Sequence, residues 1–229
     1  MLQNAPQVVK NLIIINVIFF VASMLLGQEQ AVTWLAGTYP GSPFFQPWQI
    51  ITHMFMHGGL GHLFFNMFAL YMFGSQLERL WGPQRFLNYY IISGLGGFFL
   101  HEFFIGLDFF QTYGTFFPSR AELVPSGMSD RQAVYIMEGM FGRVVGASGA
   151  VFGILLAFGL LFPNTRLMLL FPPIPIKAKY FVMGYGLIEL GLALDNGSGD
   201  NVAHFAHLGG MLFGYILLKR WQKERGTFY

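Results

Sequence analysis

Long apolar stretches with very few charged residues dominate this chain of 229 residues. Only 10% of the residues are charged, against roughly 25% in soluble globular domains, and 54% are hydrophobic. Backbone polar groups in lipid must be paired within the protein, so apolar stretches of ~17–25 residues are expected to form membrane-spanning helices. Hydropathy predicts six such spans: Asn11–Gly27, Leu60–Leu77, Phe86–Leu107, Val144–Phe162, Tyr180–Leu194 and Val202–Leu218.

The composition also excludes several other classes of protein. So few charges and so many apolar side chains do not fit a disordered chain, a coiled coil or a nucleic-acid binder with a basic stripe. The sequence contains no Cys, which excludes disulfides, cysteine zinc sites and thiol nucleophiles. The first span ends without a small-x-small cleavage pattern, so we expect it to be retained as a helix.

The positions of the basic residues predict which way the chain crosses the membrane. Lys and Arg are enriched in cytoplasmic loops. Of the thirteen Lys and Arg residues, three lie in one long loop. The other ten lie on the same predicted side of the membrane as the N-terminus: Lys10, Arg79, Arg85, Arg166, Lys177, Lys179, Lys219, Arg220, Lys223 and Arg225. The sequence therefore predicts an all-α membrane protein, one domain over residues 1–229, whose six transmembrane helices form a bundle with N- and C-termini cytoplasmic. Its core covers about 11–220, with an outer loop insertion at about 108–143.

Polar side chains within and beside these spans gather on the predicted outer side. All six histidines lie at or near outer ends of spans: His53, His57, His62, His101, His204 and His207. Asn66 and Ser148 lie on the same side. At ~1.5 Å per residue, Ser148 is ~6 Å and His207 ~7.5 Å below the starts of their spans. Polar groups inside a membrane are expensive, so their convergence at one depth indicates a functional site.

Ser148 is a candidate nucleophile in the tetrad Gly146-Ala147-Ser148-Gly149. Its small neighbours leave the hydroxyl approachable, and the first turn of a helix offers free N–H groups to a developing oxyanion. The alternative is a small residue at a helix–helix contact, which is common in membranes. The tetrad alone does not distinguish the two.

His207 is the candidate general base. It precedes a G-x-x-x-G face formed by Gly210 and Gly214, and such faces let helix backbones approach closely. His207 would then reach Ser148, take its proton and later protonate the leaving amine. The alternative is a polar residue that bridges two helices.

No acid is expected beside this pair. The only acids within the spans are Glu102 and Glu189, and neither lies on the second, fourth or sixth span. We therefore predict a Ser-His dyad rather than a triad. Phe152 follows Ser148 by one helical turn, and it either stacks on the imidazole or packs as an ordinary core residue.

His62 and Asn66 are spaced i, i+4 and so project from one helix face, where both suit an oxyanion hole. His53 and His57 are predicted to support the loop before this helix. Metal binding is the alternative, since H-x-x-x-H can chelate an ion. Because no carboxylate or Cys accompanies these histidines, we predict no metal site.

Taken together, these residues resemble the rhomboid family of intramembrane serine proteases. The resemblance covers nearly the whole chain and lies in four motifs that occur in family order: His53-x-x-x-His57, His62-x-x-x-Asn66, Gly146-Ala147-Ser148-Gly149 and Ala206-His207-x-x-Gly210-x-x-x-Gly214. The fold that it implies is a rhomboid-like six-helix bundle.

The resemblance also implies roles for these residues. Ser148 would be the nucleophile and His207 the base and acid, while His62, Asn66 and the Ser148 N–H would bind the oxyanion. His57 would help to hold the outer loop Gln28–Gly59 and the water supply. The fifth helix and Asp195–Asn201 would act as gate and cap.

Two features depart from the family pattern. The loop at 108–143 is long, and its role does not follow from the sequence. Phe152 stands where many members have Tyr, although both rings can stack on an imidazole.

The implied activity is cleavage of transmembrane protein substrates near the outer face of the membrane, through an acyl-enzyme and without a cofactor. The expected partners are these substrates and membrane lipids, and no nucleic acid is expected. An inactive rhomboid-like scaffold that binds client helices is the alternative, although such relatives typically lack the Ser or the His. A channel or transporter is less consistent, because the cytoplasmic halves of most spans lack ionisable residues. The compact core favours a prokaryotic inner membrane.

Overall fold

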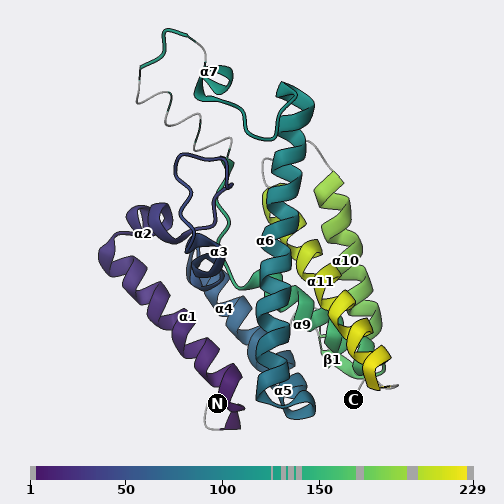
Figure 1. Ribbon diagram of the computed structural model, residues 1–229. Helices are drawn as coiled ribbons and strands as arrows, with labels where there is room; N and C mark the ends of the chain where they lie inside the picture. Colours follow the sequence, from purple (N-terminus) through teal and green to yellow (C-terminus); the bar gives the residue numbers. More distant parts are fainter. Residues whose placement is uncertain are drawn as a thin grey trace.

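The protein is described by a computed structural model that covers residues 4–124, 126–129, 133, 137, 141–168, 173–194 and 201–225. It is mainly helical (Figure 1). The first half of the chain forms α1 (Gln7–Leu26), α2 (Gln28–Leu35), α3 (Gln49–Thr52), the 3-10 turn η2 (His53–Phe55), α4 (Leu60–Ala69), the π-helical turn η3 (Leu70–Gly74), α5 (Ser75–Trp81) and α6 (Pro83–Tyr113). The second half forms α7 (Arg120–Leu123), α9 (Ser148–Leu161), β1 (Arg166–Met168), β2 (Pro175–Lys177), α10 (Ala178–Leu194) and α11 (Asn201–Arg225).

Each predicted span overlaps a helical segment. The second span overlaps three consecutive helical segments, α4, η3 and α5. α1 begins and α11 ends at the same end of the molecule, while α7 lies at the opposite end (Figure 1). Within the described ranges, only α1 and α6 are long and apolar enough to be identified as membrane-crossing by length and composition alone, and α9 is a shorter apolar helix. The mainly helical fold is thus confirmed, whereas the number of six membrane spans remains a prediction.

Several element boundaries differ from those predicted, and one connection contains strands. α9 begins at Ser148 rather than Val144, because Val144 is extended and pairs with Gly37. α6 continues to Tyr113, where Gly114 in the left-handed region (φ 72°) ends it. The strands β1 and β2 form a short antiparallel hairpin that was not predicted, in a structure that is otherwise mainly helical. Hydropathy does not report backbone pairing in a short connection between helices.

The centre of the bundle is made by α6, α9 and α11, which pack against one another. Glycines bring their backbones together. A Cβ at Gly210 would collide with the carbonyl oxygen of Gly149, and a Cβ at Gly97 would lie 2.6 Å from the carbonyl oxygen of Ala206. Such close approach is available only to residues without a side chain. The helices that carry Ser148 and His207 are therefore in direct contact.

The long loop between α6 and α9 is anchored at the end opposite the termini. Tyr39, Phe109, Leu123, Met137 and Phe141 form a second apolar cluster there. The Tyr39 hydroxyl also donates to the carbonyl oxygen of Phe116 at 2.8 Å. The described part of the 108–143 segment thus packs on the loop between α2 and α3.

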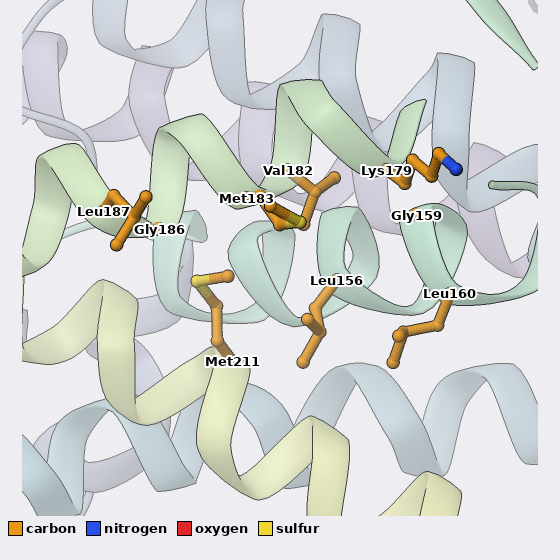
Figure 2. A pocket seen from close by; sticks show the side chains of 9 residues that line it. All are labelled: Leu156, Gly159, Leu160, Lys179, Val182, Met183, Gly186, Leu187 and Met211. Carbon is orange, nitrogen blue, oxygen red and sulfur yellow. The ribbon is translucent and has the colours of Figure 1, made fainter. Parts of the chain in front are cut away.

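An apolar cavity of about 380 Å³ is lined by residues of α9, α10 and α11. Figure 2 shows its side chains, which are apolar except for Lys179 at one end. Most residues of α10 are exposed or half-buried, and its buried residues are Ala178, Val182, Glu189 and Ala193. α10 is consequently the least embedded of the long helices near the candidate site.

Candidate active site

The segment before Ser148 is held in place by the loop that follows α2. Gly37 and Val144 exchange backbone hydrogen bonds at 2.8 and 2.9 Å. The Gly146 N–H donates to the carbonyl oxygen of His53 at 2.9 Å. Because Ser148 is the first residue of α9, these three bonds fix the point at which its helix starts.

His62 lies against the turn that leads into this helix. Gly146 has φ +123°, and a Cβ there would lie 2.8 Å from both Cε1 and Nε2 of His62 and 3.6 Å from Ser148 Oγ. A side chain at Gly146 would therefore be strained by its backbone and would collide with the imidazole. The glycine brings the His62 ring and the Ser148 hydroxyl to the same place.

Asn66 follows one turn after His62 on α4. Its side chain is buried, with 6% of its surface exposed. Its Nδ2 has no hydrogen-bond partner among the residues that the structure describes. A buried amide donor is almost always satisfied, so one without a partner calls for an explanation, and an oxyanion ligand would provide one.

His207 is held on two sides. Phe152 stacks on its ring with centroids 4.1 Å apart and planes inclined by 10°. Its Nδ1 lies 2.9 Å from Oε2 of Glu189, and the same oxygen lies 2.6 Å from Nδ1 of His204. The stacked arrangement of Phe152 is thus the one that forms.

The expectation that no acid accompanies the candidate base was wrong. It considered only acids on the second, fourth and sixth spans, whereas Glu189 reaches His207 from α10, the fifth. An acid in the middle of an apolar span is itself a signal of function, and this signal could have identified Glu189 from sequence. His204 was likewise predicted to lie near the outer end of its span, but its link to Glu189 was missed.

Ser148 and His207 are not joined by a hydrogen bond in the part of the chain that the structure describes. Their helices nevertheless touch, because a Cβ at Gly149 would lie only 3.3 Å from the carbonyl oxygen of Ala206. Gly214, one turn beyond Gly210, faces the Tyr89 hydroxyl on α6. The serine and the histidine are therefore next to the same helix–helix contact, and catalytic hydrogen bonds often tighten only with substrate bound.

His53 and His57 occupy the loop before α4 and are buried. His53 Nδ1 lies 2.9 Å from the Gln49 carbonyl oxygen, and its ring stacks on Phe98 with centroids 4.9 Å apart. The His57 ring lies edge-on to His62 at 5.1 Å, and Gln28 Nε2 donates to the His57 carbonyl oxygen at 3.0 Å.

Burial lowers the pKa of His53 to about 4, and burial together with the neighbouring His62 lowers the pKa of His57 to about 4. Both rings are therefore neutral near pH 7. Neutral rings suit residues that hold a loop in place. The contacts of His53 and His57 agree with the prediction that both support the loop before α4.

A group of one acid and two histidines that includes the candidate base could bind a metal. Glu189, His204 and His207 have ligand atoms within 4.8 Å of one another, an arrangement able to hold a metal ion. Glu102 lies on α6 beside His101, 3.9 Å from its Nε2. Of the predicted cap Asp195–Asn201, residues 195–200 lie outside the described residues.

Comparison with known proteins gives a match to the family model described as Rhomboid domain over residues 45–220. The chain is 30% identical over 178 residues to "Rhomboid protein 1, mitochondrial" of Saccharomyces cerevisiae, which covers 77% of this chain and 43% of that protein. It is 31% identical over 182 residues to "RHOMBOID-like protein 12, mitochondrial" of Arabidopsis thaliana, covering 78% of the chain and 48% of the relative. It is 23% identical over 175 residues to "Rhomboid protease GlpG" of Yersinia pestis, covering 68% and 63%.

The chain spans about half the length of these curated relatives. The match to the rhomboid family supports a membrane protein, and these relatives are both mitochondrial and bacterial. They give no support to the expectation of a prokaryotic inner membrane in particular.

Proposed function

This chain belongs to the rhomboid family, and we propose that it is an intramembrane serine endopeptidase. It cleaves transmembrane protein substrates near the outer face of the membrane, with Ser148 as nucleophile and His207 as general base and acid. The observation that carries the proposal is the meeting of Ser148 and His62 at Gly146, where only a glycine fits.

The first half of the reaction forms an acyl-enzyme. Ser148 Oγ attacks the scissile carbonyl carbon while His207 takes the hydroxyl proton, and the carbonyl oxygen becomes an oxyanion. The tetrahedral intermediate then breaks its C–N bond, His207 gives the proton to the leaving amine, and an ester to Ser148 remains. A substrate helix must unwind locally beforehand, because its carbonyls are hydrogen-bonded within the helix.

Three donors are proposed for the oxyanion: His62, the Nδ2 of Asn66 and the backbone N–H of Ser148. His62 is supported by its position at Gly146, and Asn66 by its unpartnered, buried donor. The Ser148 N–H is at the start of α9, where the positive end of the helix dipole favours an anion. Donors fixed in place before reaction are effective because they need no reorganisation.

The second half of the reaction hydrolyses the ester. Water gives a proton to His207 and attacks the acyl carbon, and Ser148 Oγ leaves with the proton returned by His207. His57 would hold this water near the site. Its Nε2 is buried and has no partner within the described ranges, and buried polar atoms of this kind typically bind water.

The membrane arrangement that we propose has six spans and both termini in the cytoplasm. Large apolar side chains point outward on α1 and α10, including Leu25, Leu26, Leu187 and Ile188. Lipid contact explains such exposure on helices of this kind. α10, with its cavity and few buried residues, would act as the gate through which substrate helices enter.

The alternative is an inactive scaffold that binds client helices. The scaffold needs no nucleophile, whereas this chain keeps Ser148 and a histidine that is held by Phe152 and Glu189. That retention favours the protease. The similarity to "Rhomboid protease GlpG" also favours the protease.

The test is cleavage of a single-span model substrate by the purified protein in proteoliposomes. We expect the wild-type protein to cut the substrate and Ser148→Ala to lower the rate by at least ~10³-fold. A fluorophosphonate probe should label Ser148 covalently. The matched control is Ser75→Ala, which changes a buried serine on α5 and should leave both readouts intact. Equal rates in the wild-type protein and Ser148→Ala would contradict the proposal.

A further inference from the structure

Glu189 is a buried acid that faces two histidines across the contact between α10 and α11. It has 6% of its surface exposed. Its Oε2 lies 2.9 Å from His207 Nδ1 and 2.6 Å from His204 Nδ1. An ionised carboxylate only accepts hydrogen bonds, so both Nδ1 atoms must carry protons.

This arrangement determines which nitrogen of His207 is available for chemistry. With the proton on Nδ1, a neutral His207 has its lone pair on Nε2, the atom that must accept the Ser148 proton. Phe152 stacks on the face of the ring, and Glu189 holds its edge. The imidazole is thereby restrained in both plane and rotation.

We propose that Glu189 is a positioning residue for the proposed Ser148–His207 pair. It fixes the Nδ1–H tautomer of His207 and stabilises the imidazolium that forms when the ring accepts the serine proton. His204 donates to the same oxygen and so keeps the carboxylate in place. The inference rests on the proposed function and replaces the simple dyad with a serine, a histidine and a glutamate from three helices.

The acid comes from the helix that is least firmly packed. One turn away from Glu189 along α10, the contact with α11 consists of Gly186 and Met211 at the cavity (Figure 2). A Cβ at Gly186 would lie 3.2 Å from Met211 Cε. Glu189 is the polar link between α10 and the base, so the base is fully assembled only when α10 lies against α11.

A metal ion bound by Glu189, His204 and His207 is the competing explanation. Zinc–nitrogen and zinc–oxygen bonds are about 2.0–2.2 Å, with the ion placed between the ligands. Two ligands of one tetrahedral ion at these bond lengths lie about 3.3–3.5 Å apart. Here the Glu189 Oε2 lies only 2.6 Å and 2.9 Å from the two Nδ1 atoms, which are hydrogen-bond distances. The hydrogen-bonded arrangement is therefore favoured.

The experiment compares Glu189→Ala, Glu189→Gln and Glu189→Asp in the full-length protein. Glu102→Gln is the matched control, since Glu102 is an equally buried acid on α6. We expect Glu189→Ala and Glu189→Gln to lower kcat on the order of 10²-fold with little change in KM, and Glu189→Asp to recover part of the loss. Glu102→Gln should keep the wild-type kcat.

A spectroscopic readout separates positioning from folding. In ¹⁵N-histidine-labelled protein in micelles, His207 should show a protonated Nδ1 and an unprotonated Nε2, assigned by comparison with His207→Gln. Glu189→Ala should lose this single tautomer, while Glu189→Asp, which keeps a carboxylate, should retain it. The same spectrum recorded in Ser148→Ala tests the Glu189 contact even if no substrate is cleaved, so failure of this inference is distinguishable from failure of the proposed function.

Three results would overturn the inference. The first is a Glu189→Ala protein with wild-type kcat and an unchanged His207 tautomer. The second is an equal loss of kcat in Glu102→Gln, which would indicate general destabilisation. The third is a change in wild-type cleavage on adding EDTA that zinc reverses, with the effect abolished in Glu189→Gln, which would identify a metal site.

Discussion

Asn66 is a short amide with a donor that is buried and unused among the described residues. His62, one turn earlier, is beside Gly146 and the Ser148 hydroxyl. If both bind the oxyanion, each removal should cost part of the transition-state stabilisation and little of the fold. We expect His62→Ala and Asn66→Ala each to lower kcat by ~10- to 1,000-fold in the proteoliposome assay.

The control for these variants is Asn16→Ala. Asn16 is also a buried amide, but on α1, where its Nδ2 donates to the Leu12 carbonyl oxygen at 2.8 Å. It should keep the wild-type kcat even if its stability falls. Wild-type rates in both His62→Ala and Asn66→Ala would remove these residues from the oxyanion hole.

The individual residues show why sequence reasoning found some partners and missed others. Ser148 and His207 were identifiable because small residues surround them, and Gly149 and Gly210 do bring their backbones into contact. Spacing along one helix also paired His62 with Asn66. Glu189 was missed because its partner lies on another helix, and spacing along a chain does not say which helices are neighbours.

The start of α1 shows how one helix is capped by another. Glu78 on α5 accepts hydrogen bonds from the N–H groups of Val8 and Val9 at 2.9 and 2.8 Å. α1 has no side-chain cap of its own, and Glu78 is buried. The carboxylate thus satisfies donors at the positive end of the helix.

Removing this cap should destabilise the protein measurably. Glu78→Ala leaves two N–H groups without their acceptor, so we expect the free energy of unfolding to fall by about 2–4 kcal/mol. Glu78→Gln should lie in between, because its amide oxygen still accepts. The measurement is reversible unfolding in mixed micelles, followed by circular dichroism.

Glu122 provides the comparison, since it caps the short helix α7 through Ser119 but is fully exposed. The Ser119 hydroxyl and backbone N–H lower the pKa of Glu122, so its carboxylate is ionised at neutral pH. Glu122→Ala should change the stability far less than Glu78→Ala, because water replaces the lost contacts. Equal effects would mean that burial is not what makes the Glu78 cap important.

At the scale of the elements, apolarity was enough to predict where helices form but not where they end. The first turn of the fourth predicted span is extended instead, because Val144 forms backbone hydrogen bonds with Gly37 from a distant loop. α6 continues past its apolar part to Tyr113, where a glycine in the left-handed region stops it. These ends are decided by backbone pairing and by backbone angles, which hydropathy does not measure.

The whole molecule has two chemically different ends. Lys10 near the start of α1, Arg79 on α5, Arg85 near the start of α6 and Lys219 near the end of α11 are basic. Figure 1 shows the start of α1, α5 and the end of α11 at the same end of the molecule. The opposite end holds α7 and the second apolar cluster. The basic end should face the cytoplasm, where anionic lipids and the positive-inside rule favour Lys and Arg.

The two ends of α6 test this orientation directly. Gln84 and Gln111 are both exposed and lie near opposite ends of the helix. At 1.5 Å per residue they are about 40 Å apart, more than the ~30 Å of a bilayer core, so both should be in water. The sequence has no Cys, so a single substitution gives a single label.

We therefore expect a membrane-impermeant maleimide to label Gln111→Cys in intact bacterial cells that express the protein. Gln84→Cys should be labelled only after the membrane is permeabilised, and the unsubstituted protein should not be labelled at all. Both variants should retain cleavage activity, because neither side chain is near Ser148. Labelling of Gln84→Cys alone in intact cells would show that the topology is the inverse of the predicted one, with the candidate site open toward the cytoplasm. Labelling of both before permeabilisation would mean that α6 does not cross the membrane.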